Sequence, residues 1–278
     1  MRVVDVMTKE VKCAEVPGSR AEALDLLRKL SVSAIPVVKR ETNELLGMVT
    51  LRKLFENQDE EQLAMLIDRE IPTAQLNDKI EVAANKLSKS NSRRMPVLKD
   101  GKLVGVITVK DIVFRAIAEM DIKEPASEHM RTYVIIVWDG TPIKVVVEIM
   151  DISGIRGIPV INESGTMVGI IDDSDIIKDS KVEVGSKISQ MAGRSEGDSW
   201  TWDSEARIYI TKSLLKIPNK LVKDVMTKNL VTISRITPIS RVAQLMKENS
   251  VEQTPVVSSE GKLVGIVRDI DLLRSLAE

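Results

Sequence analysis

Residues Arg93 to Arg115 read R-R-M-P-V-L-K-D-G-K-L-V-G-V-I-T-V-K-D-I-V-F-R. An apolar, β-favouring run ends at Asp100-Gly101, a two-residue turn signal that favours positive φ, and a second apolar run, Leu103 to Ile107, follows at once. This pattern predicts a β-hairpin. The second strand leads into Thr108-Val-Lys-Asp111, a capping-box signature that opens a helix. The predicted unit is therefore strand, turn, strand, helix.

The unit recurs four times along the chain. Each copy carries a proline in its first long strand and a glycine nine to eleven positions later. The prolines are Pro36, Pro96, Pro159 and Pro255, and the glycines are Gly47, Gly105, Gly169 and Gly265. A helical segment opens 18 residues before each proline. Copies of about 60 residues account for most of the chain, which is the pattern of a repeat protein.

The charge balance bounds the possible partners. The 278 residues include 40 basic and 41 acidic side chains, so the composition does not supply the basic face that nucleic acid requires. No apolar run approaches about 18 residues and no signal-peptide pattern opens the chain. We therefore expect a soluble, cytoplasmic protein that binds neither a membrane nor nucleic acid.

Cysteine and histidine are too scarce for several kinds of site. A single cysteine, Cys13, cannot form an internal disulfide, and with one histidine, His129, there is no cluster for zinc. No nucleophile motif accompanies His129, so we expect it to pack rather than catalyse. Cys13 lies in an apparent strand without a nearby base, which predicts a buried, inert thiol.

The spacing of the copies sets the expected domains. Repeats are predicted at 1–57, 71–122, 123–180 and 221–278, with a connecting helix at 58–70 and an inserted connection at 181–220. The last two prolines are 96 residues apart, against 60 and 63 for the earlier pairs, so roughly 35 residues are inserted. The insert contains Trp200 and Trp202. Packing on the adjacent core is the favoured interpretation of these rings, and a lid or partner surface is the alternative.

In each copy, the residues three and six positions past the glycine are chemically informative. Six residues past it stand Lys53, Asp111, Asp175 and Asp271, and three residues past it stand Thr50, Thr108, Asp172 and Arg268. A carboxylate at the N-terminal end of a helix, here called the helix mouth, can accept hydrogen bonds from both hydroxyls of a ribose. The amides of the first helical turn and a side-chain hydroxyl can hold a phosphate. The same T-x-x-D pattern is also a capping box, which needs no ligand. In a single copy the cap is the favoured interpretation.

The phrases D-V-M-T, P-V-V and G-x-h-T-x-x-D together resemble the CBS domain family. The chain is similar to archaeal stand-alone proteins that contain four CBS domains as two tandem pairs. The resemblance implies an α+β fold of four βαββα-type repeats paired into two disc-like modules. It also implies clefts that bind adenosyl ligands, namely AMP, ADP, ATP or S-adenosylmethionine, and a regulatory rather than catalytic role. Recurrence of the aspartate, together with this resemblance, favours a ribose anchor over a simple cap.

The resemblance assigns ligand-binding residues in each of the last three copies. In the second copy these are Thr73, Ala74, Arg94, Met95, Pro96, Thr108 and Asp111; in the third, Ile158, Pro159, Asp172 and Asp175; and in the fourth, Thr254, Pro255, Arg268 and Asp271. The proline-containing strand would line an apolar slot for adenine. Arg93 or Arg94 could meet a phosphate, although a solvated face is the default interpretation of such a pair. The first copy has Lys53 in place of the acid, and lysine has no acceptor for a ribose.

The third and fourth copies differ in the charge beside the anchor. Asp172 would repel a phosphate and attract the sulfonium of S-adenosylmethionine, whereas Arg268 could pair with a phosphate or with a neighbouring acid. The two pairs are therefore predicted to prefer different ligands. The run Asp172 to Asp175 also resembles a carboxylate cluster for Mg²⁺, but no phosphate-binding loop accompanies it.

These observations predict a non-enzymatic sensor that binds an adenosyl molecule as a regulatory ligand, without a resident cofactor or metal. Its partner would be another protein or a second copy of the chain. A ligand-independent interaction scaffold, in which Asp111, Asp175 and Asp271 act only as caps, is the alternative. A Mg²⁺-dependent nucleotide hydrolase at Asp172 to Asp175 ranks third.

Overall fold

The computed structural model describes residues 1–30, 32–57, 59–90, 92–155, 157–172, 175–176, 178, 181–190, 207–216 and 219–276, with 181–190 and 207–216 described by their backbone alone. The chain divides into two compact units. The first comprises Met1–Val134, Val231–Ser259 and Val264–Glu278, and the second comprises Ile135–Leu230 and Glu260–Leu263.

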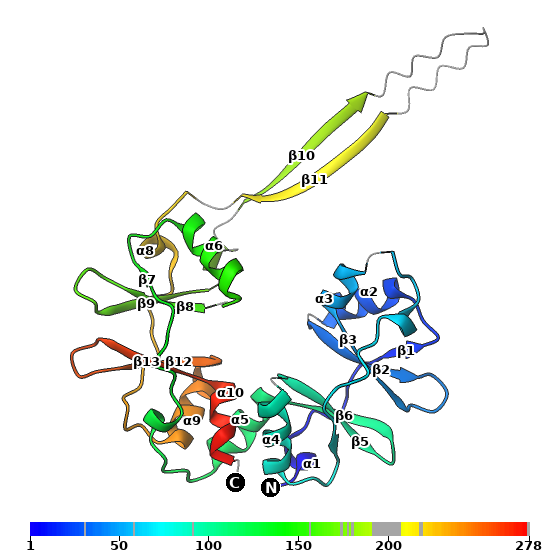
Figure 1. Ribbon diagram of the computed structural model, residues 1–278, viewed down its shortest axis with the longest axis horizontal. Helices are drawn as coiled ribbons and strands as arrows, with labels where there is room; N and C mark the ends of the chain where they lie inside the picture. Colours follow the sequence, from blue (N-terminus) through cyan, green and yellow to red (C-terminus); the bar gives the residue numbers. More distant parts are fainter. Residues whose placement is uncertain are drawn as a thin grey trace. The chain divides into compact units, whose positions relative to one another are not determined.

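The first three repeats share one sheet topology, in which a short strand runs parallel to a central strand that pairs antiparallel with the next (Figure 1). The sheets are β1 (Ala14–Val16), β2 (Ala34–Lys39) and β3 (Leu45–Thr50); β4 (Ala74–Gln75), β5 (Arg94–Lys99) and β6 (Lys102–Thr108); and β7 (Val137–Trp138), β8 (Gly157–Ile161) and β9 (Met167–Asp172). The fourth repeat pairs β12 (Gln253–Val257) with β13 (Leu263–Arg268), and an isolated parallel bridge joins Ile233 to Val256.

The predicted hairpin turn is confirmed. Asp100 and Gly101 have φ values of 52° and 77°, the left-handed conformation that such two-residue turns require. The strand pairing continues from Lys99 opposite Lys102 to Arg94 opposite Thr108. Arg94 therefore lies beside the residue that caps the following helix.

Two sets of helices cover the sheets. Each parallel strand pair needs a crossover, which is supplied by α2 (Arg20–Leu30), α4 (Ile80–Ser90), α6 (Ile143–Ser153) and α9 (Ile239–Asn249). The last strand then leads into α3 (Leu51–Glu56), α5 (Val109–Arg115) or α10 (Asp269–Leu272). In α4 the buried residues are Ile80, Ala83, Ala84 and Leu87, the one-sided spacing that the sequence predicts for a core-facing helix.

Each repeat begins with a short opening turn, which packs on the other repeat of its pair. These turns are α1 (Val3–Val6), η1 (Leu63–Met65), η3 (Ala126–Glu128) and α8 (Val222–Val225). The amide of Val3 donates to Asp78 O at 2.9 Å in the second repeat, and the amide of Leu63 donates to Gly18 O at 3.2 Å in the first. In the second unit, the amide of Val222 donates to Thr141 O at 2.9 Å. Paired repeats therefore exchange their opening segments.

The connecting helix predicted at 58–70 is wrong. Among the described residues of this segment, helical structure is limited to the single 3-10 turn η1. The reason is that Leu63, Leu66 and Ile67 are the second repeat's opening turn and pack into the core of the first repeat. Asp68 continues as a bridge to Met48 rather than as a helical residue.

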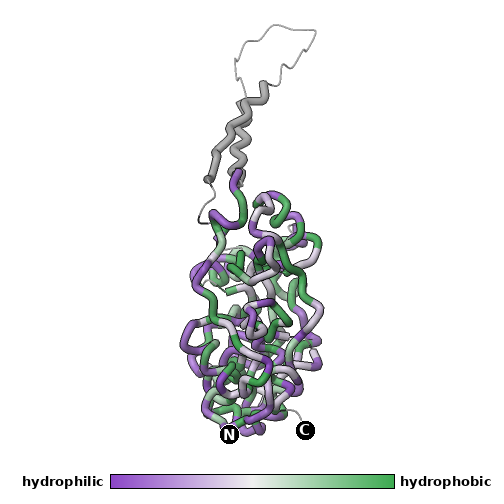
Figure 2. Tube along the Cα trace, turned by 90° about the vertical axis from the view of Figure 1, so that its left-hand side faces the viewer, coloured by the Kyte–Doolittle hydropathy of each residue, from purple (hydrophilic) through white to green (hydrophobic). Residues whose placement is uncertain are grey.

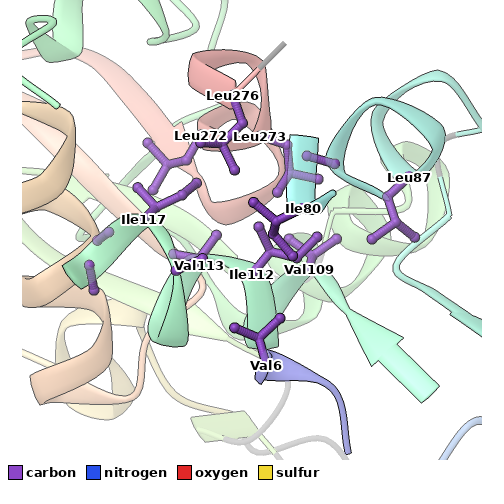
Figure 3. Close-up of a cluster of buried hydrophobic side chains, with 14 of the residues drawn as sticks. Val6, Ile80, Leu87, Val109, Ile112, Val113, Ile117, Leu272, Leu273 and Leu276 are labelled. Carbon is purple, nitrogen blue, oxygen red and sulfur yellow. The ribbon is translucent and has the colours of Figure 1, made fainter. Parts of the chain in front are cut away.

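The largest core joins the helices of the second and fourth repeats, which both lie in the first unit. Figure 3 shows its centre, where side chains of α4, α5 and the turn η2 (Ile117–Glu119) meet those of α10 and the turn η4 (Leu273–Leu276). Leu87, Ile112, Ile117, Leu272 and Leu273 are fully buried there. Ile112 and Leu272 stand at equivalent positions, each seven residues past its repeat glycine, so equivalent helices of the two repeats meet in this core.

The predicted insert folds, in its described part, as an antiparallel ribbon. β10 (Lys181–Gln190) pairs with β11 (Arg207–Lys216) from Lys181 opposite Lys216 to Gln190 opposite Arg207. Trp200 and Trp202, for which core packing was predicted, lie outside the described residues.

Hydrophobic and hydrophilic residues alternate in short stretches along the trace (Figure 2). Within the described ranges, no helix combines the length and the apolar character needed to cross a membrane.

Candidate functional site

The residue six positions past each repeat glycine lies at the start of the helix that follows the last strand of the repeat. The capping pattern of the sequence predicts this place. Thr108 caps α5: its Oγ1 accepts the amide of Asp111 at 3.0 Å, and Asp111 Oδ2 accepts the amide of Thr108 at 3.0 Å. The Thr108 hydroxyl also donates to Asp111 Oδ2 at 2.6 Å. Arg115 Nη1 lies 3.4 Å from the other oxygen, Oδ1. Asp111 is therefore a buried cap whose Oδ1 faces a half-exposed guanidinium.

A residue from an exchanged opening segment contacts Lys53, Asp175 and Asp271, and Thr8 holds the equivalent position in the repeat of Asp111. Thr8, Asp68, Arg131 and Thr227 all follow an opening turn and all form a bridge to the residue after a repeat glycine, namely Val106, Met48, Ile266 and Ile170. The glycine makes this approach possible. A Cβ on Gly105 would lie 2.7 Å from Thr8 O, and one on Gly265 would lie 2.8 Å from Arg131 O. Either contact would push the opening segment away.

Asp175 faces a threonine in the second unit. The Thr227 hydroxyl donates to Asp175 Oδ1 at 3.0 Å, and the amide of Asp172 donates to Asp175 Oδ2 at 3.2 Å. Asp172 replaces threonine as the cap, because its Oδ1 accepts the amide of Asp175 at 3.0 Å. Asp173 and Ser174, part of the Mg²⁺ interpretation, lie outside the described residues.

Asp271 is enclosed by arginines. Arg131 donates to its Oδ1 from Nη2 at 2.9 Å and from Nε at 3.0 Å, and Arg268 Nε donates to its Oδ2 at 3.1 Å. Arg274 Nη2 lies 3.8 Å away. Burial alone would raise the pKa of Asp271, but the hydrogen bonds from Arg131 and Arg268 outweigh it and hold the pKa below the ordinary value. The predicted pairing of Arg268 with an acid is thus present.

The first repeat carries the reverse charge arrangement. Lys53 Nζ lies 2.7 Å from Asp68 Oδ1, and the hydrogen bond to Asp68 raises the pKa of Lys53. Thr50 caps α3 by accepting the amide of Lys53 at 3.1 Å. As the sequence indicates, this site offers a cation where the other repeats offer a carboxylate.

The two arginines predicted to meet a phosphate both cross to other repeats. Arg94 donates to Ala34 O and to Ser33 Oγ, each at 3.1 Å, so it joins the first and second repeats. Arg93 donates to Asp269 at 2.7 Å and to Glu252 at 2.9 Å in the fourth repeat. Neither guanidinium stands as a free surface charge.

The remaining predicted residues line the strands beside these sites. Ala74, Met95, Ile158 and Thr254 have no exposed surface, and Pro96, Pro159 and Pro255 are buried. Thr73 is partly exposed, and its carbonyl accepts Lys86 Nζ at 2.9 Å.

The sequence did not single out the four facing residues. Thr8 and Thr227 end the D-V-M-T phrase that carried the family resemblance, so a signal for them was present. Asp68 and Arg131 lack the phrase and are located only by their bridges.

The described residues contain no cluster of His, Cys, Asp or Glu side chains that could hold a metal. His129 is buried with Nε2 2.8 Å from Glu124 Oε2, which agrees with a packing role. Cys13 is only partly buried, against the prediction, because it lies beside a surface groove lined also by Glu15, Asp25 and Arg40. Burial and the nearby Glu15 carboxylate raise the pKa of its thiol, which keeps it protonated.

The chain belongs to the CBS domain family. CBS domains match residues 3–60, 63–117, 126–181 and 222–278, so the fold is a four-repeat α+β structure of this family.

Similar proteins share this organisation over their whole length. An uncharacterized conserved protein from Pyrococcus horikoshii is 28% identical, with a TM-score of 0.72 over 100% of both chains. Protein MJ1225 of Methanocaldococcus jannaschii is 22% identical over 92% of this chain and 91% of its own. Its crystal structure, proposed as an archaeal homologue of g-AMPK, superposes at a TM-score of 0.64 and shares the fold. A shorter likeness, covering 40% of this chain at a TM-score of 0.37, is to the CBS pair of protein MJ0100 in complex with 5′-methylthioadenosine and S-adenosyl-L-methionine.

Proposed function

We propose that this protein is a non-enzymatic sensor that binds an adenosyl ligand, S-adenosylmethionine or an adenine nucleotide, and transmits occupancy to a protein partner or a second copy through a change in shape. The observation that carries the proposal is a buried carboxylate at a helix mouth opposite a neutral hydroxyl. Asp175 accepts a hydrogen bond from Thr227. Asp111 occupies the equivalent position of the second repeat, where Thr8 forms the bridge equivalent to that of Thr227. Such a carboxylate supplies the acceptors that a ribose diol needs.

The surroundings of Asp111 suit the rest of such a ligand. The amides at the start of α5 and the Thr108 hydroxyl form an anion-favouring helix mouth. Arg94 and Arg115 lie at the same end of the second repeat, because Arg94 is opposite Thr108 in the strand register and Arg115 contacts Asp111. Both guanidiniums can exchange a backbone carbonyl for a phosphate, the stronger acceptor.

A ligand-independent scaffold remains the second candidate, and one observation favours it. Asp111 already has hydrogen-bond or ion-pair partners on both carboxylate oxygens, from Thr108 and Arg115. A ribose must displace Arg115 to reach Oδ1. Arg115 has an alternative partner, because its Nη1 also donates to Val6 O at 2.8 Å.

Asp111→Ala tests the proposal. We expect adenosyl affinity to fall by about 1.5–3 kcal/mol, the range for hydrogen bonds to a charged group. The matched control is Asp78→Ala, because Asp78 Oδ2 also accepts a backbone amide, that of Gln75 at 2.9 Å, in the same repeat. Isothermal titration with AMP, ATP and S-adenosylmethionine measures the difference. Equal affinities in both variants would remove Asp111 as an anchor.

A second measurement separates the sensor from the scaffold. The purified protein is denatured, and the released material is examined by absorbance at 260 nm and by mass spectrometry. Release of an adenosyl compound supports the sensor. Failure to bind any of the three probes, with no released compound, supports the scaffold.

A further inference from the structure

The four helix mouths differ in what the exchanged opening segment presents to them. Threonine stands at the facing position in two sites, as Thr8 and Thr227, and an ion-pair partner stands there in the other two, as Asp68 and Arg131. The bridges place all four residues in the same register after a repeat glycine. The comparison is therefore between equivalent positions.

At the fourth repeat this partner uses the acceptors that a ribose would need. Arg131 binds Oδ1 of Asp271 through two nitrogens, at 2.9 and 3.0 Å, and its Nε also lies 3.1 Å from Oδ2. Arg268 occupies Oδ2 from the other side at 3.1 Å, and the carboxylate side chain is only 3% exposed. A bidentate guanidinium is among the strongest partners of a carboxylate, so a neutral diol competes poorly for Asp271.

The first repeat is blocked by the same contact with the charges exchanged. Lys53 holds Asp68 at 2.7 Å, so the carboxylate that the opening segment brings to this helix is already paired. Introducing an aspartate at position 53 alone would place its carboxylate against that of Asp68, which disfavours the ionised forms of both. Both positions must change before this mouth resembles that of Asp111.

Among the described residues, neither threonine site shows such a two-nitrogen ion pair. Thr227 gives Asp175 a single neutral hydrogen bond, and a hydroxyl can rotate to serve a ligand. Thr8 is exposed and carries no charge. Arg115 approaches Asp111 at 3.4 Å through the same nitrogen that donates to Val6 O, so it does not form the two-nitrogen fork seen at Asp271.

We propose that the residue after each opening turn decides which helix mouths bind an adenosyl ligand, so that the Asp111 and Asp175 sites bind while the Lys53 and Asp271 sites are closed by internal ion pairs. The inference rests on the proposed function and adds specificity-determining residues to it. It predicts fewer bound ligands than there are aspartates at helix mouths, because Asp271 is excluded although it is an aspartate.

The experiment exchanges the facing residues in the full chain and counts sites by isothermal titration with AMP and with S-adenosylmethionine. Arg131→Thr should add a site to those of the wild type, and Thr8→Arg should remove one. Arg241→Thr is the matched control, because the partners of Arg241 among the described residues, Gln244 and Glu248, lie with it on the exposed face of α9. It should leave the number of sites unchanged.

A second opening variant guards against misfolding of the first. The double variant Lys53→Asp with Asp68→Thr should also add a site, whereas Lys53→Asp alone should not. Circular dichroism checks that each variant is folded. A folded Arg131→Thr or double variant with the wild-type number of sites overturns the inference, as does retention of the site in Thr8→Arg. If the wild type binds neither probe, the proposed function itself fails.

Discussion

Asp269 and Asp271 lie two positions apart in one helix, and both are almost fully buried, but their pKa values move in opposite directions. Burial dominates at Asp269 and raises its pKa in spite of the hydrogen bonds from Arg93. At Asp271 the hydrogen bonds from Arg131 and Arg268 outweigh burial and lower the pKa. Asp271 is held by two guanidiniums and Asp269 by one, so hydrogen bonding outweighs burial only at Asp271.

Asp271 should therefore contribute to acid sensitivity. A carboxyl whose folded pKa is depressed stabilises the fold above the ordinary aspartate pKa, near 3.9, and this contribution is lost as the pH falls through the lower folded value. Asp271→Asn should lower the free energy of unfolding at pH 7, and the difference from wild type should shrink towards about pH 3. Urea unfolding at both pH values measures it. A difference independent of pH would contradict the assignment.

Thr254 carries a buried hydroxyl for which the described residues provide no hydrogen-bond partner. It stands at the position that Met95 fills in the second repeat, and Met95 and the nearby Val256 both belong to the core cluster of the first unit. An unpaired buried hydroxyl costs about 1–3 kcal/mol, so Thr254→Val should raise the free energy of unfolding by roughly 1 kcal/mol. The contrasting control is Thr108→Val, which removes a capping hydroxyl and should destabilise. Chemical denaturation distinguishes the two, and a destabilised Thr254→Val would show that the hydroxyl has a partner.

Asp172 should bias the Asp175 site against phosphates. Two unit charges about 4 Å apart interact by roughly 4 kcal/mol at an effective dielectric of 20, enough to discriminate a phosphate from a sulfonium. With the Asp111 site silenced by Asp111→Ala, the remaining site should prefer S-adenosylmethionine to AMP, and Asp172→Thr should shift the preference towards AMP. Competitive titration gives the ratio. Tighter AMP binding in the presence of Asp172 would contradict the charge argument.

At the scale of elements, the exchanged opening turns explain why each repeat carries its glycine. The glycine lets the opening segment of another repeat lie against the last strand, and that segment delivers the facing residue to the helix mouth. Local sequence predicts the turn but not its destination, because the segment packs on a repeat other than the one it begins.

Leu63→Ala tests the exchange. Leu63 is 1% exposed and packs among Ala23, Leu27 and Leu54 of the first repeat. Its truncation should cost about 2–5 kcal/mol and reduce hydrogen-exchange protection in α2, although Leu63 opens the second repeat. Met65, in the same turn, is 68% exposed, so Met65→Ala should be nearly neutral. Loss of protection confined to α4 would contradict the exchange.

At the scale of the molecule, the second and fourth repeats form one core across the boundary between the two predicted pairs. Arg93 joins them at the edge of that core through Asp269, whose side chain is 2% exposed. Arg93 is adjacent in sequence to Arg94, and Asp269 is adjacent to Arg268. Arg94 and Arg268 each lie beside a candidate site. The two sites therefore share a physical connection.

Arg93→Met should destabilise the protein by about 3 kcal/mol, because it leaves the buried Asp269 carboxylate without its main partner. Adding Asp269→Asn should recover part of the loss, since the uncompensated charge is then removed. Glu252→Gln is the control, because Glu252 is 61% exposed and its pair with Arg93 should contribute little. Thermal unfolding compares the variants. Equal losses in the single and double variants would exclude a buried-charge origin.

Sequence alone determined the elements of this protein and the identity of its helix-mouth residues. Hydrophobic period, turn chemistry and capping boxes are local, so the hairpin at Asp100-Gly101 and the cap at Thr108 were predictable. Recurrence then located Lys53, Asp111, Asp175 and Asp271 in register. The prediction of a connecting helix at 58–70 was wrong because its apolar residues were interpreted as one face of a local helix.

Tertiary structure alone decided what each helix mouth faces. Arg131 meets Asp271 across 140 positions, and Arg93 meets Asp269 across 176. No local pattern specifies such pairs, because they depend on which repeat receives an opening segment and on which helices pack together. The sequence supplies a carboxylate in three repeats, and long-range packing decides whether an opening segment brings a threonine or an arginine to each repeat.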